Sequence, residues 1–204
     1  MLNRRNILKQ GGVASMALAV TAVQAGVSPA DAAGLADLQA RKLPDPATTP
    51  VPNPPYPAGL TPEERRHLKT FDELDFKVFS NAKWNRLDES HAKNVRVHWP
   101  DGHITKGIEQ HIADLSAMFV WAPDTRIKSH PLRVASGQLT AVTGVMQGTF
   151  TKPMPDGEGG FIQPTGKAYA INMCTVGMWN RKGVMSEEFL FWDDANFYRQ
   201  IGLG

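Results

Sequence analysis

The spacing of apolar residues changes from a helical period to an alternating one partway along this chain, and this change restricts the fold more than any other feature. Up to residue 121 apolar residues mostly recur every three or four positions, which predicts two amphipathic helices, one starting near Thr61 and one covering about Gly107 to Trp121. Between them one short alternating segment, Val95 to Trp99, predicts a strand. From Arg126 apolar residues alternate with polar residues, which predicts strands. The alternating segments are roughly 126–135, 139–150, 168–179 and 184–193. Helices followed by an antiparallel run of strands predict an α+β fold.

The start of the folded domain is marked by the segment Thr61-Pro62-Glu63-Glu64. It combines a threonine at the N-cap, a proline at the first helical position and a glutamate that can reach back to the cap. Just upstream, residues 43–62 hold eight of the fifteen prolines, and such a density prevents helix and sheet formation. We therefore expect residues 33–60 to form a proline-rich linker or strap and residues 61–204 to form one domain.

The first 32 residues have the layout of an export signal. Arg4 and Arg5 precede a short, weakly apolar run, and Ala30-Asp31-Ala32 offers a cleavage site between small residues. The paired arginines resemble the twin-arginine signal with which bacteria export folded proteins. We therefore expect a periplasmic or secreted protein that has no membrane contact once residues 1–32 are cleaved. A retained or lipid-anchored N-terminal helix is the alternative.

The charge of the chain argues against a nucleic-acid partner. The sequence has 22 basic and 20 acidic residues, and the signal segment holds three of the basic and one of the acidic residues. Subtracting them leaves 19 of each sign, so no basic stripe remains for nucleic acid or an anionic membrane. Cys174 is the only cysteine, which excludes an intramolecular disulfide, and its apolar strand context predicts a packing role.

The last predicted strand carries acids as well as apolar residues. Its odd positions are Glu187, Phe189, Phe191 and Asp193, and its even positions are Glu188, Leu190, Trp192 and Asp194. Successive side chains of a strand point to opposite faces. Because a buried carboxyl group is costly unless something compensates it, these acids are candidates for a site. Parity alone does not choose between the two faces, and for Glu187 we expect a structural salt link.

Several motifs, in their order along the chain, resemble the SnoaL-like polyketide cyclase family of the NTF2-like superfamily. They are His98-Trp99-Pro100-Asp101-Gly102, Ala122-Pro123-Asp124, Gln147-Gly148-Thr149-Phe150, Pro164-Thr165-Gly166-Lys167 and Gln200-Ile201-Gly202-Leu203. The resemblance implies a cone-shaped, curved antiparallel sheet packed on the N-terminal helices, with a deep cavity for a small apolar ligand or substrate. It also implies acid/base chemistry without a cofactor, and a homodimer formed through the outer face of the sheet.

The same resemblance assigns roles in the last strand. Asp193 corresponds to the aspartate with which cyclases of the family abstract a proton beside a carbonyl group, and Asp194 would then cap the C-terminal helix. Phe189 and Phe191 would line the cavity as substrate-binding residues. Their apolar rings would keep Asp193 partly dry, which would raise its pKa and make it a stronger base.

Two further residues complete the predicted site. His98 is the second catalytic candidate, because an imidazole can relay a proton or donate a hydrogen bond to an enolate oxygen. Phe150 stands where family members often have a histidine, and it makes the expected pocket more apolar. Two functions therefore stay open. One is an enzyme that cyclises, isomerises or hydrolyses a small hydrophobic carbonyl compound, and the other is a non-catalytic binding protein for a small apolar ligand.

The histidines predict no metal site. The four that cluster in the first half of the domain are His91, His98, His103 and His111. Their spacings match no helical or zinc-binding pattern, and no carboxylate is placed in the sequence to complete a ligand shell.

Overall fold

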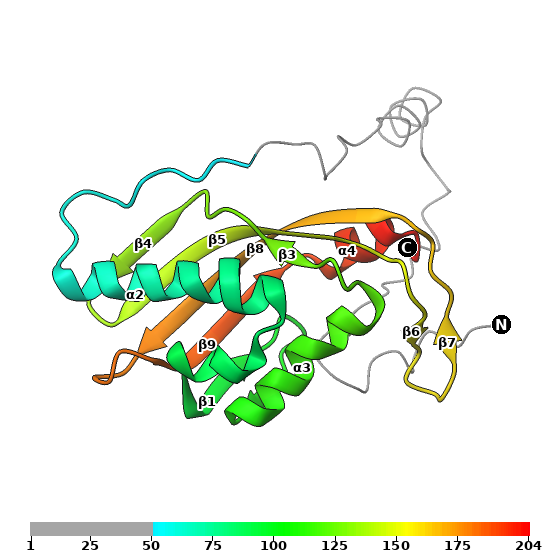
Figure 1. Cartoon of the computed structure of the whole chain (residues 1–204), viewed down its shortest axis with the longest axis horizontal. Helices are drawn as coiled ribbons and strands as arrows, with labels where there is room; N and C mark the ends of the chain where they lie inside the picture. Colours follow the sequence, from blue (N-terminus) through cyan, green and yellow to red (C-terminus); the bar gives the residue numbers. More distant parts are fainter. Residues whose placement is uncertain (1–50) are drawn as a thin grey trace, which may run out of the picture.

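A computed structural model describes residues 51–204 as a curved sheet with helices packed on one face (Figure 1). The predicted export signal, and the proline-rich segment up to residue 50, lie outside the described residues. Within the described part of the chain, no helix is both long and apolar enough to cross a lipid bilayer.

The first described helix, α2 (Pro62–Glu73), starts where the capping box predicts it. The Thr61 side chain accepts a hydrogen bond from the Glu64 backbone, and the Glu64 side chain accepts one from the Thr61 backbone. The chain continues through a π-helical turn, η1 (Leu74–Val78), and two 3-10 segments, η2 (Phe79–Asn81) and η3 (Trp84–Glu89). The predicted apolar stripe of this helix is buried: Leu68, Phe71, Leu74 and Val78.

The main sheet of the described residues has seven strands in the order β2-β1-β9-β8-β5-β3, with β4 also paired to β5. Their bounds are β1 (His91–His98), β2 (Ile104–Lys106), β3 (Arg126–Ile127), β4 (Arg133–Ser136), β5 (Leu139–Thr149), β8 (Ala168–Trp179) and β9 (Met185–Trp192). Neighbouring strands are antiparallel, except that β1 and β9 run parallel. This pair joins the first strand of the chain to the last. A separate two-stranded sheet pairs β6 (Met154–Pro155) with β7 (Phe161–Ile162).

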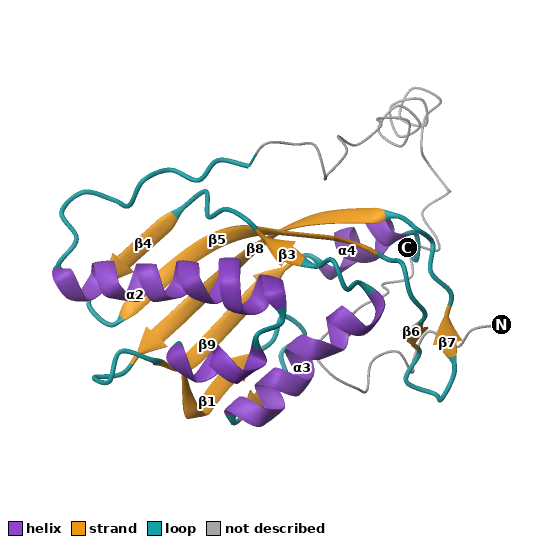
Figure 2. Ribbon diagram, viewed as in Figure 1, coloured by secondary structure: helices purple, strands orange, loops and turns teal. Residues whose placement is uncertain are grey.

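Figure 2 shows α2 and α3 (Ile108–Trp121) on the same face of the sheet, and α4 (Asp194–Ile201) at the C-terminal end of the fold. The sequence predicts that α3 turns Ile108, Ile112, Leu115 and Phe119 inward, but these side chains are only half-buried. The fully buried residues of α3 are His111, Asp114, Met118 and Trp121. The helix is therefore rotated relative to the prediction and turns two polar side chains toward the sheet.

The order of helices and strands confirms the predicted α+β arrangement, with one difference in the middle of the chain. The segment 126–135 was expected to be a single strand, but it forms the short strands β3 and β4, separated by a loop that contains His130. His130 is fully buried in this loop. A buried polar ring in a loop requires hydrogen-bond partners, and these lie at the site described next.

Candidate active site

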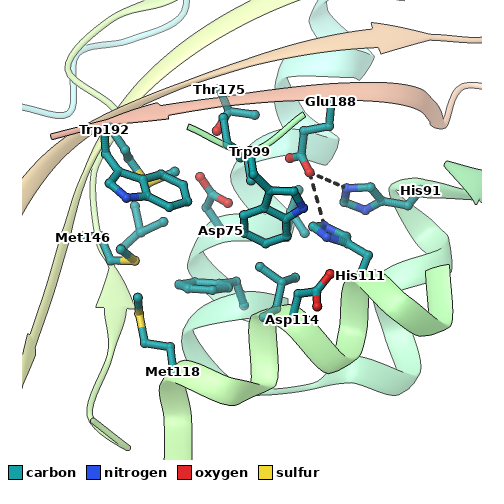
Figure 3. Close-up of a pocket in the computed structure, with 16 residues that line it drawn as sticks. Asp75, His91, Trp99, His111, Asp114, Met118, Met146, Thr175, Glu188 and Trp192 are labelled. Atoms are coloured by element: carbon teal, nitrogen blue, oxygen red, sulfur yellow. Dashed lines mark ion pairs between the residues drawn. The ribbon is translucent and has the colours of Figure 1, made fainter. Parts of the chain in front are cut away.

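A cavity lies between the inner face of the sheet and the helical segments η1 and α3 (Figure 3). The centre of a water molecule can reach about 60 Å³ of it, whereas one bound water needs roughly 10–15 Å³. Most of the lining is apolar and includes Trp99, Trp192 and the methionines Met118, Met146 and Met173. The polar lining residues are Asp75, His91, His111, Asp114, Thr175 and Glu188. The cavity therefore suits a small, mostly apolar molecule with one or two polar atoms.

Strand β9 turns its even positions into this cavity. Glu188 lies opposite Gly177 of β8, and Leu190 and Trp192 follow on the same face of the strand. Glu188 is only 4% exposed. Because side chains alternate across the sheet, Glu187, Phe189 and Phe191 lie on its outer face, whereas Met185, which precedes a register shift, is buried in the core.

Two histidines from separate elements approach Glu188. Nε2 of His111, on α3, lies 3.2 Å from Oε2 of Glu188, and Nε2 of His91, at the start of β1, lies 3.6 Å from the same oxygen (Figure 3). The parallel pairing of β1 with β9 brings His91 to this position. Burial alone would raise the pKa of Glu188, but the two histidines outweigh it and hold that pKa far below its ordinary value. Glu188 is therefore ionised despite its burial.

A second carboxyl group, Asp75, lines the cavity from the π-helical turn η1. Its Oδ2 lies 2.8 Å from Nε2 of His130, and Nδ1 of the same ring lies 2.7 Å from Oδ1 of Asp72. The Asp72 side chain is 17% exposed. A chain of three hydrogen-bonded groups thus leads from the cavity toward the surface. When both carboxylates are ionised, both ring nitrogens of His130 donate.

The surroundings of these three groups alter how strongly each one holds a proton. Burial raises the pKa of Asp75, and the hydrogen bond from His130 opposes this only in part. Burial disfavours the charged form of His130, but its hydrogen bonds to Asp72 and Asp75 outweigh burial and raise the pKa of the ring. Burial alone would raise the pKa of Asp72, but hydrogen bonds from His130, Arg133 and Tyr56 outweigh it and lower that pKa. Asp75 and His130 therefore both hold a proton more readily than in water, while Asp72 stays ionised.

Residues 53–56 of the proline-rich segment bind to the outer end of this chain of groups. Arg133 donates hydrogen bonds to the backbone oxygen of Pro54 at 3.1 Å and to Oδ1 of Asn53 at 2.6 Å. The Tyr56 hydroxyl donates to Asp72 at 2.6 Å. Burial and this carboxylate raise the pKa of Tyr56 to about 12, so the hydroxyl remains a donor at neutral pH. This part of the segment therefore lies on the domain as a strap.

The residues that the sequence predicts for the site do not line the cavity. Phe189 and Phe191 occupy odd positions of β9 and lie on the outer face, where Phe191 is 51% exposed. His98 stacks on Phe189 with ring centroids 4.1 Å apart. Phe150 is fully buried in the core, with its ring centroid 5.4 Å from that of Trp121. The opposite face of the strand therefore lines this cavity, and the substrate-binding roles of Phe150, Phe189 and Phe191 stay predictions.

Asp193 is the N-cap of α4, and its Oδ1 accepts a hydrogen bond from the Asn196 backbone at 2.9 Å. The expected placement of Asp193 at a dry cavity rim is wrong, because β9 ends at Trp192 and the Asp193 side chain is exposed. Asp194 was expected to be the cap, but it accepts a hydrogen bond from the Trp192 indole at 2.6 Å. Catalytic roles for Asp193 and for His98 stay predictions.

The salt link predicted for Glu187 is confirmed. Its carboxylate pairs with Arg96 of β1 and lies 2.6 Å from Nε2 of His98. This cluster sits on the outer face of the sheet, so Glu187 and Glu188 are neighbours in the chain with opposite surroundings.

The positions of the histidines in the structure correct the prediction about metal ligands. His103 pairs with Asp101 in a turn, but His91 and His111 share Glu188. One ligand atom from each of these three residues lies within 4.8 Å of the other two. The expectation that no carboxylate joins the histidines is therefore wrong. The sequence could not indicate this group, because it depends on the pairing of the first strand with the last.

Some of the cavity residues can be recognised in the sequence, because they are polar residues on the apolar face of a predicted helix. Asp75 lies four residues after Phe71 and seven after Leu68, inside the apolar stripe of the first helix. His111 and Asp114 likewise align with Met118 on one face of the second helix. A polar residue on the inward face of an amphipathic helix is a candidate for a site. His130 lies in a loop and has no such signal.

Comparisons with known proteins identify related sequences and folds. The family model described as SnoaL-like polyketide cyclase matches residues 67–201. No curated protein matches the sequence.

Solved structures share the fold at low sequence identity. A candidate SnoaL-like polyketide cyclase from Jannaschia sp. CCS1 is 19% identical, with a TM-score of 0.62 over 71% of this chain and 97% of that chain. IdmH, a candidate polyketide cyclase from Streptomyces antibioticus, is 21% identical, with a TM-score of 0.56 over 67% of this chain and 98% of that chain. An M. tuberculosis LEH-like epoxide hydrolase is 10% identical, with a TM-score of 0.53 over 69% and 92% of the two chains. These likenesses confirm the predicted fold and carry no activity over to this chain.

Proposed function

Because the chain belongs to the SnoaL-like polyketide cyclase family, we propose that it is an enzyme that moves protons on a small hydrophobic carbonyl compound. The reaction class is isomerisation or ring closure that starts with removal of a proton from carbon beside the carbonyl group. The substrate is small, because the cavity admits only a few heavy atoms in its present shape. The three lining methionines can adapt to irregular apolar shapes and allow some growth of the ligand.

The observation that carries this proposal is the position of Asp75 in the cavity wall with His130 bonded to it. A carboxylate in an apolar cavity is poorly solvated, so it takes up a proton more readily than it does in water. A general base that removes a proton from carbon works best when its pKa is raised toward the operating pH. Asp75 is therefore the proposed base, and it later returns the proton to the product.

His130 and Asp72 are the proposed positioning residues for this base. His130 approaches Asp75 with one ring nitrogen and Asp72 with the other, so it can share the proton that Asp75 gains. Asp72 stays ionised through its bonds to His130 and Arg133, and its charge stabilises the charged ring. The strap residues Asn53 and Tyr56 support this arrangement from outside.

The cellular location and the oligomeric state are part of the same proposal. The export signal predicted in residues 1–32 supports action outside the cytoplasm. The outer face of the sheet exposes Phe191 by 51% and Met178 by 40%, and both side chains share one face through the pairing of β8 with β9. Exposed apolar residues on one sheet face support a homodimer formed through it.

Exchange of protons for deuterons beside the carbonyl group tests this function without knowledge of the natural substrate. Small cyclic ketones such as cyclopentanone and cyclohexanone are incubated with the purified protein in D₂O, and loss of the signal is followed by proton NMR. The proposal expects exchange well above the buffer rate for at least one ketone that also raises the thermal midpoint. A ketone that raises the midpoint without faster exchange would favour a binding protein instead.

A further inference from the structure

Three buried side chains direct one ligand atom each toward a common point at one end of the cavity. They are His91 from β1, His111 from α3 and Glu188 from β9 (Figure 3). The distances to Oε2 of Glu188 are 3.6 Å from Nε2 of His91 and 3.2 Å from Nε2 of His111. Each of the three residues is less than 5% exposed. Three rigid elements thus hold the group, and water has little access to it.

Hydrogen bonding does not explain this arrangement. Oε2 of Glu188 and Nε2 of His91 are buried and have no hydrogen-bond partner among the described residues. The two rings lie near the carboxylate, but neither forms a hydrogen bond with that oxygen. A buried carboxylate oxygen without a donor is costly, so such an atom calls for an explanation in the form of a bound ion or ligand.

The spacing of the three atoms fits a metal ion. Zinc binds histidine nitrogen and carboxylate oxygen at roughly 2.0–2.2 Å, so two ligand atoms of a tetrahedral site lie about 3.3 Å apart. The two distances to Oε2 of Glu188, 3.2 Å and 3.6 Å, bracket that separation. We infer that His91, His111 and Glu188 bind a divalent transition metal ion, with a coordination position open toward the cavity. Two imidazoles favour zinc or iron over magnesium or calcium, which take oxygen ligands.

The residues around the group suit this role. Nδ1 of His91 lies 2.9 Å from the Ser90 hydroxyl, and a bond from Nδ1–H to that oxygen leaves Nε2 free to bind a metal. Asp114 lies one turn after His111 on α3 and also lines the cavity. Its Oδ1 is held by Gln110 at 2.8 Å, while its Oδ2 is buried without a hydrogen-bond partner. That oxygen is an unpaired acceptor in the wall of the same cavity.

This site goes beyond the proposed function and does not depend on it. A metal ion with an open position would bind the oxygen of a ligand in the cavity and act on it as a Lewis acid. Asp75 contributes no ligand atom to the group. If the protein binds no metal, the proposed role of Asp75 as a base still stands. If Asp75 proves not to be the base, the proposed metal site still stands.

Cobalt binding to the purified full-length protein tests the inference directly. The protein is stripped with a chelator, dialysed and titrated with Co²⁺, whose visible absorption reports a four- or five-coordinate site. Zn²⁺ affinity and stoichiometry are measured by calorimetry. The inference expects one ion per chain, an intense Co²⁺ band, and a rise in thermal midpoint with Zn²⁺. Absence of the band together with no stoichiometric Zn²⁺ uptake would overturn it and leave a plain histidine–glutamate cluster.

Adjacent residues supply matched control variants. Glu188→Gln removes the central ligand, and Glu187→Gln makes the same change one position earlier on the outer face. Zn²⁺ affinity should fall more than about 100-fold in Glu188→Gln, since loss of an outer-shell partner alone costs about 10–100-fold. It should be unchanged in Glu187→Gln. His111→Asn serves as a second ligand variant if Glu188→Gln does not fold. Equal affinities in the Glu187 variant and in a folded ligand variant would contradict the assignment.

Discussion

Nε2 of His130 lies 2.8 Å from Oδ2 of Asp75, and of these two residues only Asp75 lines the cavity. A ligand in the cavity therefore meets a carboxyl group that has a protonatable ring behind it. Burial raises the pKa of Asp75, while hydrogen bonds to two carboxylates raise the pKa of His130 against the effect of burial. The two groups can share one proton, which is the property that general acid/base chemistry requires.

His130→Gln should change how stability depends on pH. Because folding raises the pKa of His130, its contribution to the free energy of unfolding is complete below about pH 6.5 and is lost as pH rises through the raised pKa. The thermal midpoint of the natural protein should therefore fall relative to that of His130→Gln as the pH rises above about 6.5. A loss of about 1 kcal/mol corresponds to roughly 2–4 °C. Parallel curves for the natural protein and His130→Gln would contradict the raised pKa.

Asp72→Asn should shift the pH profile of the reaction. Asp72 does not line the cavity, but its carboxylate helps to raise the pKa of His130. Its loss should move the titration of the Asp75–His130 pair to lower pH and reduce kcat by about 10-fold or more at neutral pH, with little change in KM. Steady-state rates from pH 5 to 9 measure this. A lower rate with an unshifted profile would mean that Asp72 has only a structural role.

Asp193→Ala should weaken the fold without affecting catalysis. The substitution removes the side chain that caps α4, which costs about 1 kcal/mol and roughly 2–4 °C in thermal midpoint. Asp193→Asn keeps a good capping residue and should stay close to the natural protein. Calorimetry and the exchange assay are compared on both variants. A large loss of activity in a well-folded Asp193→Asn protein would support the catalytic role expected from the family resemblance.

Phe191→Asp should separate a homodimer into monomers. It places a charge on the exposed apolar face that Phe191 shares with Met178, and a buried unpaired charge disfavours association. Light scattering coupled to size-exclusion chromatography measures the mass. A natural protein that is monomeric at micromolar concentration would rule out the homodimer.

The fold could largely be predicted from residue periodicity and from capping signals. The capping box at Thr61 marks the start of α2, and the alternating segment 168–179 coincides with β8. These signals are local, since they depend on neighbours within one or two turns. The pairing of β1 with β9 is not local, because it joins strands more than eighty residues apart, and the sequence carried no sign of it.

The candidate site was missed because its residues meet only through that pairing and through the choice of strand face. Parity places Glu187 and Glu188 on opposite faces of the strand, but only the packed structure makes the face of Glu188 the inner one. The family resemblance directed attention to Asp193, which caps a helix. The inward position of Asp75 in the first helix was available from helical spacing, but its partner His130 comes from a loop with no periodic pattern.

The exchange rate of Asp75→Asn tests the central claim most directly. The amide has nearly the same shape as the carboxyl group but does not act as a base, so the protein should remain folded. With a ketone that the natural protein exchanges in D₂O, Asp75→Asn should lose at least about 100-fold in rate, while Asp193→Asn keeps the natural rate. Exchange by Asp75→Asn at the natural rate would contradict the account.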